Sequence, residues 1–92
     1  MKWTEAIQLP RLDIEGRGWT METKLLKMAE EFGEASQAFN KDQDPEKLAA
    51  ETFDVIQTGV TMLYILESKG IDVQTQFVAF LEKLEARNYL RR

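Results

Sequence analysis

The chain has 92 residues, of which 43% are hydrophobic and 30% are charged, and it contains five Gly and two Pro. This composition excludes a collagen-like, low-complexity or wholly disordered protein and fits one small domain spanning residues 1–92. Without Cys there are no disulfides, and a monomer of this size buries only about two-thirds of its unfolded surface. We therefore expect a helical core that a second copy completes.

Charge and residue types restrict the possible chemistry. The chain contains neither His nor Cys, so catalysis must use carboxylates, Lys or Arg. The formal net charge of -4 disfavours nonspecific binding to nucleic acid or to an anionic membrane. The N-terminus lacks the apolar core of a signal peptide, and no apolar run is long enough to span a membrane. We expect a soluble, cytoplasmic protein with no nucleic-acid or membrane partner.

Capping signals predict three long helices. The expected helices run from Met21 to about Phe39, from Pro45 to about Lys69 and from Val73 to about Leu90. The residues suited to cap their first turns are Thr20, Asp44 and Asp72. Gly70 fits the end of the second helix. Before these helices we expect only a short helix over Thr4–Leu9 and a loop over Arg11–Gly18.

Apolar spacing indicates how these helices pack. The first helix carries a narrow seam of Met21, Leu25, Met28, Phe32, Ala35 and Phe39, which is typical of a helix–helix contact. The middle helix is apolar around most of its C-terminal half, so we expect it to be buried on several sides. The last helix carries one stripe of Val73, Phe77, Phe80, Leu81 and Leu84. The pattern predicts an all-α helical bundle of three long helices plus a short N-terminal segment, completed by dimerisation.

Two acidic pairs stand on the first two helices. Glu31 and Glu34 lie about 60° apart on the first helix, and Glu51 and Asp54 lie about 60° apart on the second. A short turn joins the helices, so they are expected to be antiparallel neighbours whose acids can face each other. Four facing carboxylates repel one another unless a cation neutralises them. Oxygen-only ligation favours Mg²⁺, with Mn²⁺ as a substitute.

The arrangement of acids resembles a known signature. It consists of Glu30-Glu31-x-x-Glu34, a spacer of 16 residues, and Glu51-x-x-Asp54. This pattern is similar to that of the all-α nucleoside triphosphate pyrophosphohydrolases of the MazG-like superfamily, over roughly Trp19–Arg91. The resemblance implies a four-helix-bundle-like fold, assembled as a dimer or a dimer of dimers. It also implies a Mg²⁺-dependent hydrolase acting on an acid anhydride, which cleaves a nucleoside triphosphate between the α and β phosphates.

The resemblance also implies roles for individual residues. The metal would be held by Glu31, Glu34, Glu51 and Asp54. Glu30 would orient or deprotonate the attacking water, or help to hold a second ion. Metal ions lower the pKa of bound water enough for a carboxylate to suffice as the base. The phosphates would be held by Lys83, Arg87, Asn88 and Arg91. Trp19 could stack on the base, although an indole more often anchors a core.

Other interpretations remain open at this point. A related enzyme class, phosphoribosyl-ATP pyrophosphatase, has similar acid-rich helices and length. Alternatively, the chain is a non-catalytic helical interaction module, in which the acids form a solvated face tied to Lys27 and the basic residues only complement a helix dipole. A calcium loop beginning at Asn40 is excluded, because its sixth position, which requires Gly, is Pro45. The chain also lacks a phosphate-binding P-loop motif.

Overall fold

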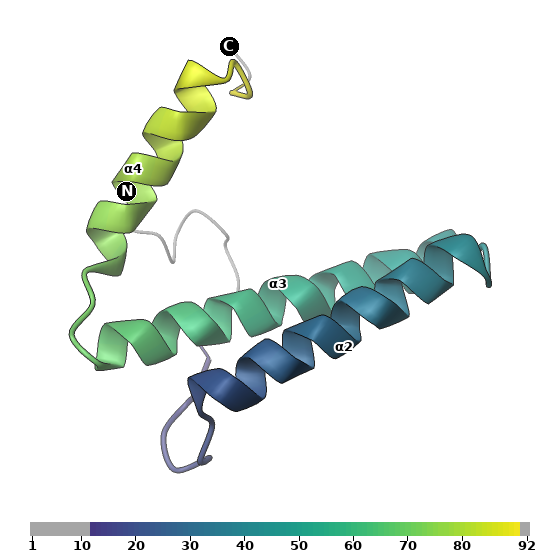
Figure 1. The fold of residues 1–92 in the computed structure, drawn as a ribbon, viewed down its shortest axis with the longest axis horizontal. Coiled ribbons are helices and arrows are strands. Elements are labelled where there is room, and N and C mark those ends of the chain that lie inside the picture. Colours follow the sequence, from purple (N-terminus) through teal and green to yellow (C-terminus); the bar gives the residue numbers. More distant parts are fainter. Residues whose placement is uncertain (1–11, 91–92) are drawn as a thin grey trace. The chain divides into compact units, whose positions relative to one another are not determined.

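The computed structural model describes residues 12–90, which contain three α-helices and no strand (Figure 1). The helices are α2 (Met21–Asn40), α3 (Pro45–Ser68) and α4 (Val73–Ala86). The predicted all-α class is confirmed. None of the described helices is long and apolar enough to cross a membrane. The helix expected over Thr4–Leu9 lies outside the described residues.

The chain divides into two compact units. Ile14–Ile65 forms one unit, which holds α2 and most of α3. The last turn of α3 and the whole of α4 belong to the other unit. The two acidic pairs therefore lie within one unit, and the basic residues predicted to bind phosphate lie in the other.

All three predicted N-caps are present. The hydroxyl of Thr20 accepts a hydrogen bond from the backbone N–H of Thr23 at 3.2 Å, and the hydroxyl of Thr23 accepts one from the N–H of Thr20 at 3.1 Å. Asp44 Oδ1 accepts from two first-turn N–H groups of α3, both at 3.1 Å. Asp72 Oδ1 accepts from the N–H of Thr75 at 3.0 Å. These bonds satisfy amide groups that have no partner within the helix, which fixes where each helix begins.

The end of α3 depends on Gly70, as predicted. Gly70 has a φ of 87°, the left-handed conformation that Gly adopts without steric cost. Its N–H donates to the carbonyl of Glu67 at 3.0 Å, and the N–H of Ile71 donates to the carbonyl of Leu66 at 3.1 Å. This pair of bonds is a Schellman motif, which ends a helix by satisfying its last carbonyls.

The third helix ends four residues earlier than predicted. Asn88 has a φ of 58°, and its N–H donates to the carbonyl of Glu85 at 3.1 Å. The N–H of Tyr89 donates to the carbonyl of Leu84 at 2.9 Å, which completes a second Schellman motif. The expected extension to Leu90 is therefore wrong, because Asn tolerates the left-handed conformation and terminates the helix here.

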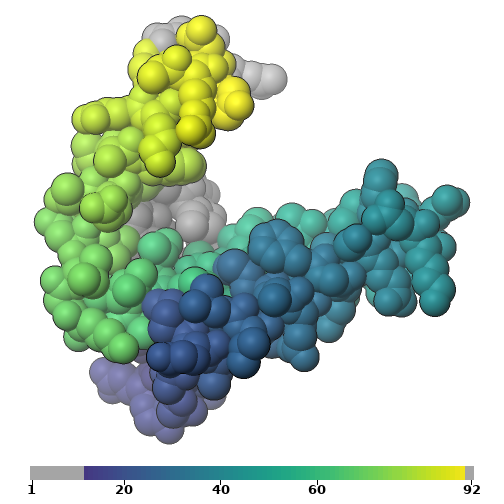
Figure 2. Space-filling view, in the orientation of Figure 1, coloured from purple at the N-terminus to yellow at the C-terminus, as the bar shows by residue number. Residues whose placement is uncertain are grey.

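Helices α2 and α3 form an antiparallel hairpin, as predicted (Figure 1). A Cβ added at Gly59 would lie 3.6 Å from Met28 Cε, and farther along the hairpin Thr58 hydrogen-bonds Glu31. The residue number rises on α2 as it falls on α3, which is the pattern of an antiparallel contact. Side chains fill the space between the two ribbons along the hairpin (Figure 2).

The face of α2 that packs on α3 differs from the predicted seam. Three members of that seam are largely exposed, namely Leu25 at 52%, Phe32 at 58% and Phe39 at 64%. The buried residues of α2 are instead Glu31 and Ala38, and its half-buried residues are Met21, Lys24, Met28 and Ala35. The centre of this covered face is rotated by roughly 50° from the apolar stripe. Small residues, Ala38 on α2 and Gly59 on α3, allow close approach of the two helices. Since α3 covers only one side of α2, much of the stripe stays on the surface.

The middle helix is buried on several sides in its C-terminal half, as predicted. Its buried residues, Thr58, Val60, Thr61, Tyr64 and Ile65, span about 160° around the helix. Half-buried side chains occupy the opposite side, namely Met62, Leu63 and Leu66. Nearer its N-terminus Phe53 is 63% exposed. On α4, Val73 is buried, whereas Phe80 of the predicted stripe is 50% exposed.

Candidate functional site

Glu31 is a buried carboxylate on the face of α2 that contacts α3. It is only 3% exposed, and its Oε1 accepts a hydrogen bond of 2.5 Å from the hydroxyl of Thr58, which is 2% exposed. Lys27 pairs with Glu30 instead, at 3.6 Å on the exposed side of the helix. The interpretation of the acids as a solvated face tied to Lys27 therefore fits Glu30 and is wrong for Glu31.

Glu34 and Glu51 meet across the hairpin. The pKa of Glu51 is raised above its ordinary value, chiefly because its carboxyl shares a hydrogen bond with the carboxyl of Glu34. Desolvation and the negative charges of Glu34 and Asp54 raise the pKa further, and the positive charge of Lys47 opposes them. Two carboxyls this close favour a proton or a cation between them, because like charges repel in partial burial.

One oxygen of this pair has no hydrogen-bond partner among residues 12–90. Glu51 Oε2 is buried and makes no hydrogen bond. A buried carboxylate oxygen without a partner is costly, since it has lost its water and gained nothing in exchange. A divalent cation at this oxygen would remove that cost, so the residues present fit a metal site.

The described residues do not bring all the predicted metal ligands together. Within residues 12–90, no three carboxylates stand close enough to hold an ion jointly. The structure joins Glu34 to Glu51, while Glu31 is held by Thr58 and Asp54 acts on Glu51 only through its charge.

Glu30, the predicted base, lies apart from this pair. It is exposed and lies about 100° around α2 from Glu31. Its carboxylate is in the exposed ion pair with Lys27. Of the predicted acids, Glu30 is thus the one whose position is explained by ordinary surface pairing.

The predicted phosphate-binding residues belong to the second unit. Lys83 is exposed in the last turn of α4, and Arg87 is its C-cap. Asn88 follows in the left-handed conformation described above, so it lies beyond the helix on which it was expected. Arg91 lies outside the described residues. Lys83 also complements the negative end of the helix dipole.

Trp19, the predicted base-stacking residue, is contacted by two cations. The ammonium of Lys24 lies 3.9 Å from the centre of the indole ring, and the guanidinium carbon of Arg17 lies 5.2 Å from it. Both are cation–π contacts, which attract a positive charge to the electron-rich ring face. A base that stacked on this indole would compete with these cations for the ring.

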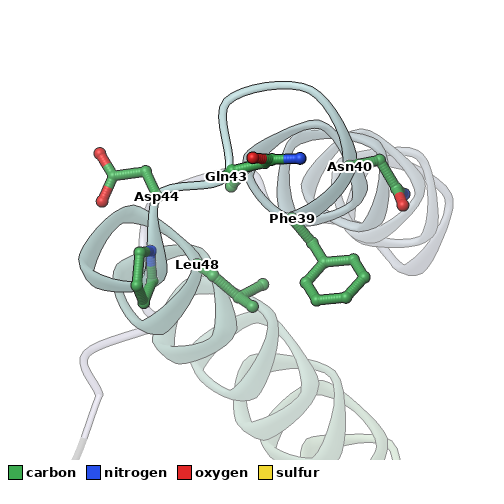
Figure 3. A pocket seen from close by; sticks show the side chains of 7 residues that line it. Phe39, Asn40, Gln43, Asp44 and Leu48 are labelled. Atoms are coloured by element: carbon green, nitrogen blue, oxygen red, sulfur yellow. The ribbon is translucent and has the colours of Figure 1, made fainter.

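A cavity of about 420 Å³ lies at the turn between α2 and α3. Figure 3 shows Phe39 and Leu48 on the inner side of this turn, with Asp44 directed away from them. Among the described residues, Asp44 is the only carboxylate that lines it, and that group caps α3. The cavity therefore offers no pair of acids and is not the metal-binding candidate.

Sequence reasoning missed Thr58, although a signal was present. Thr58 follows Glu51 by seven residues, a spacing that places both on one face of a helix, about 20° apart. The heptad spacing shows that Thr58 shares the acidic face of α3. It does not show that its hydroxyl reaches Glu31, which depends on how closely the helices approach.

Comparison with known proteins gives one family. The family model of the MazG nucleotide pyrophosphohydrolase domain matches residues 19–90, which is most of the chain. Neither the curated proteins nor the solved structures contain a significant match.

Proposed function

Because the chain belongs to the MazG nucleotide pyrophosphohydrolase family, we propose that it hydrolyses nucleoside triphosphates, ribo or deoxy, between the α and β phosphates. The oxygen of a water molecule forms a new P–O bond, and a P–O bond of the oxygen that bridges the α and β phosphates breaks. The products are a nucleoside monophosphate and pyrophosphate. The reaction depends on Mg²⁺, for which Mn²⁺ can substitute. The observation that carries this proposal is the buried, unpartnered Oε2 of Glu51 beside Glu34.

In this proposal the acids of both helices hold the metal. Glu34 and Glu51 supply the facing oxygens, Glu31 adds a second carboxylate from α2, and Asp54 adds a second from α3. Bound there, a divalent cation screens the triphosphate charge and lowers the pKa of coordinated water. The carboxylates fix the position of the reacting phosphate, and their hard oxygen atoms suit Mg²⁺.

The remaining residues act on the substrate. Glu30 orients or deprotonates the attacking water, and Lys83, Arg87, Asn88 and Arg91 hold the phosphates and the leaving pyrophosphate. Trp19 stacks on the base, in competition with the cations that now contact its ring. A carboxylate base is consistent with a chain that contains no His.

We also propose that the protein assembles as a homodimer or a dimer of dimers. Leu25, Phe32 and Phe39 present an apolar stripe on α2, each more than half exposed. Exposed apolar surface of this kind favours association, because water is released when two such faces meet. A second copy offers the same stripe, as two-fold symmetry requires.

A product assay tests the activity. Purified protein is incubated with Mg²⁺ and a panel of ribo- and deoxynucleoside triphosphates, and pyrophosphate is separated from single phosphate. The expected products are pyrophosphate and monophosphate, lost in Glu34→Gln and retained in the charge-matched control Glu82→Gln on α4. Glu30→Gln should lower kcat by about 10²–10⁴-fold, the range for loss of a general base, and leave Mn²⁺ affinity unchanged.

Other outcomes would contradict the proposal. Release of single phosphate would place cleavage at a different bond. Silence with every nucleoside triphosphate but hydrolysis of phosphoribosyl-ATP would identify the related pyrophosphatase class instead. Silence with both, together with a melting temperature that Mg²⁺ and Mn²⁺ leave unchanged, would favour a non-catalytic helical interaction module.

A further inference from the structure

Two threonines of α3 are almost completely buried, and they use their hydroxyls differently. Thr61 is 0% exposed, and its hydroxyl donates to the carbonyl of Gln57 in its own helix at 3.0 Å. This is the usual arrangement for a threonine inside a helix, where the hydroxyl bonds the carbonyl four residues earlier. Thr58 is 2% exposed, and its hydroxyl donates across the hairpin to Glu31 Oε1 instead.

The cross-helix bond has a direct consequence for Glu31. A hydroxyl carries a single proton, so Thr58 donates to the carboxylate at the expense of its own helix carbonyl. Hydrogen bonds to a carboxylate are stronger than those between neutral groups, and this one is short, at 2.5 Å. The bond therefore fixes the rotamer of Glu31 in a position that is only 3% exposed.

The same bond leaves Glu31 able to bind a cation. A carboxylate has about four lone-pair sites on its two oxygens, and the hydroxyl of Thr58 occupies one of them, on Oε1. The rest of the group remains available to a metal. Glu34, one turn farther along α2, is in contact with Glu51 of the facing helix. The carboxylate held by Thr58 thus belongs to a residue one helical turn before Glu34 on α2.

We propose that Thr58 is a positioning residue that acts through Glu31 and sets the affinity of the acidic pairs for a divalent cation. The proposal rests on the proposed function, since it assumes that Glu31 is a metal ligand. Hydrogen-bond partners of metal ligands orient those ligands before the metal arrives, and their loss typically lowers metal affinity about 10–100-fold. Thr58 makes no contact with substrate in this role.

The test compares two buried threonines of one helix. Binding of Mn²⁺ to the full chain is titrated by electron paramagnetic resonance of the free ion, without nucleotide. Thr58→Val, which keeps the shape and removes the hydroxyl, should weaken Mn²⁺ binding about 10–100-fold. Thr58→Ser should restore it, and the control Thr61→Val should bind like the wild type.

A second pair of variants separates positioning from folding. Glu31→Gln keeps a group that Thr58 can bond but removes the charge, so adding Thr58→Val to it should change Mn²⁺ affinity no further. If Thr58→Val does not fold, Thr58→Ala compared with Thr58→Ser carries the same test. Melting temperatures measured without metal show how much each substitution destabilises the fold. If Thr58 has only a structural role, Thr58→Val and Thr61→Val should change Mn²⁺ affinity equally.

The outcomes distinguish this proposal from the proposed function. Wild-type protein that binds no Mn²⁺ would overturn the metal-dependent function and the role of Thr58 together. Wild-type protein that binds Mn²⁺, with Thr58→Val and Thr61→Val indistinguishable from it, would overturn the role of Thr58 alone and leave the acidic site standing.

Discussion

Glu51 links the charge of the acidic site to the stability of the fold. Its pKa is raised above the ordinary 4.5, first by the hydrogen bond with Glu34 and then by desolvation and nearby negative charge. The folded protein therefore binds this proton more tightly than the unfolded chain does. The resulting stabilisation is complete below the unfolded pKa of 4.5 and is lost as the pH rises through the folded value.

We predict that Glu51→Gln raises the melting temperature of the metal-free protein at neutral pH. The neutral amide removes the repulsion with Glu34 and needs no proton, so stability should also depend less on pH between about 4.5 and neutrality. Thermal unfolding followed by circular dichroism over this pH range measures both effects. Glu82→Gln, which removes an equal charge from α4, should leave the pH dependence unchanged.

With Mg²⁺ added, the wild type should have a higher melting temperature than Glu51→Gln, the reverse of the order expected without metal. The wild type gains stability from an ion that binds only the folded state, whereas Glu51→Gln lacks the central ligand. A Glu51→Gln protein that melts below the wild type without metal at pH 7 would contradict the repulsion between Glu51 and Glu34. One that gains as much stability from Mg²⁺ as the wild type would contradict the role of Glu51 as a metal ligand.

For single residues, the sequence predicts which acids share a helix face, but it does not predict which of them are buried. The i, i+3 spacing places Glu31 with Glu34 and Glu51 with Asp54 whatever the helices pack against. Burial of Glu31 depends on the rotation of α2 against α3, which the apolar stripe misplaced by roughly 50°. Helical periodicity identifies an apolar face, but it does not say whether the chain itself or a second copy covers that face.

At the scale of whole helices, ends that are set by neighbouring residues agree with the prediction. The starts of all three helices agree with the prediction, because a capping side chain acts on amides only two or three residues away. Gly70 ends α3 for an equally local reason. The early end of α4 was missed because residues 85–90 contain neither Gly nor Pro to mark a stop, and the apolar stripe, whose last member is Leu84, does not show where the helix ends. Asn88 ends the helix by taking a left-handed conformation.

We predict that one substitution has opposite effects at two glycines. Gly70→Ala should destabilise the protein by about 1 kcal/mol, because a Cβ is strained at its φ of 87°. This strain is independent of crowding, since no described atom beyond the adjacent residues lies within 4 Å of the added Cβ. Gly33→Ala should stabilise it by about 0.5–1 kcal/mol, since Gly33 lies inside α2 with open space around its Cβ position. Urea denaturation of the metal-free proteins measures both values. If both substitutions change the free energy of unfolding in the same direction, the difference in backbone conformation between Gly70 and Gly33 does not explain their effects.

The exposed apolar stripe on α2 bears on how copies of the chain associate. Phe32 and Phe39 are 58% and 64% exposed, and a chain of 92 residues can bury only a small core of its own. Sequence analysis predicted this stripe as a helix–helix contact, and the hairpin uses a neighbouring face for that purpose. The stripe therefore remains the surface through which we propose that copies associate.

We predict that Phe32→Glu weakens this association. In light scattering coupled to size-exclusion chromatography, the wild type should have two or four times the monomer mass, and the variant should shift toward the monomer on dilution. Its melting temperature should fall, because subunit association stabilises the folded state by mass action. Gln37→Glu adds the same charge to an exposed position on the other side of α2 and should leave the mass unchanged. A monomeric wild type, or a variant that associates equally well, would contradict the proposed interface.

We propose above that carboxylates of α2 and α3 hold a divalent cation between them. Crystals grown with Mn²⁺ and a nonhydrolysable nucleoside triphosphate, measured for anomalous scattering, locate that ion directly. We predict an anomalous peak between Glu34 and Glu51, with Glu31 and Asp54 beside it. A peak elsewhere, for example at the turn that holds Asp42 and Asp44, or no peak near Glu51, would contradict the claim.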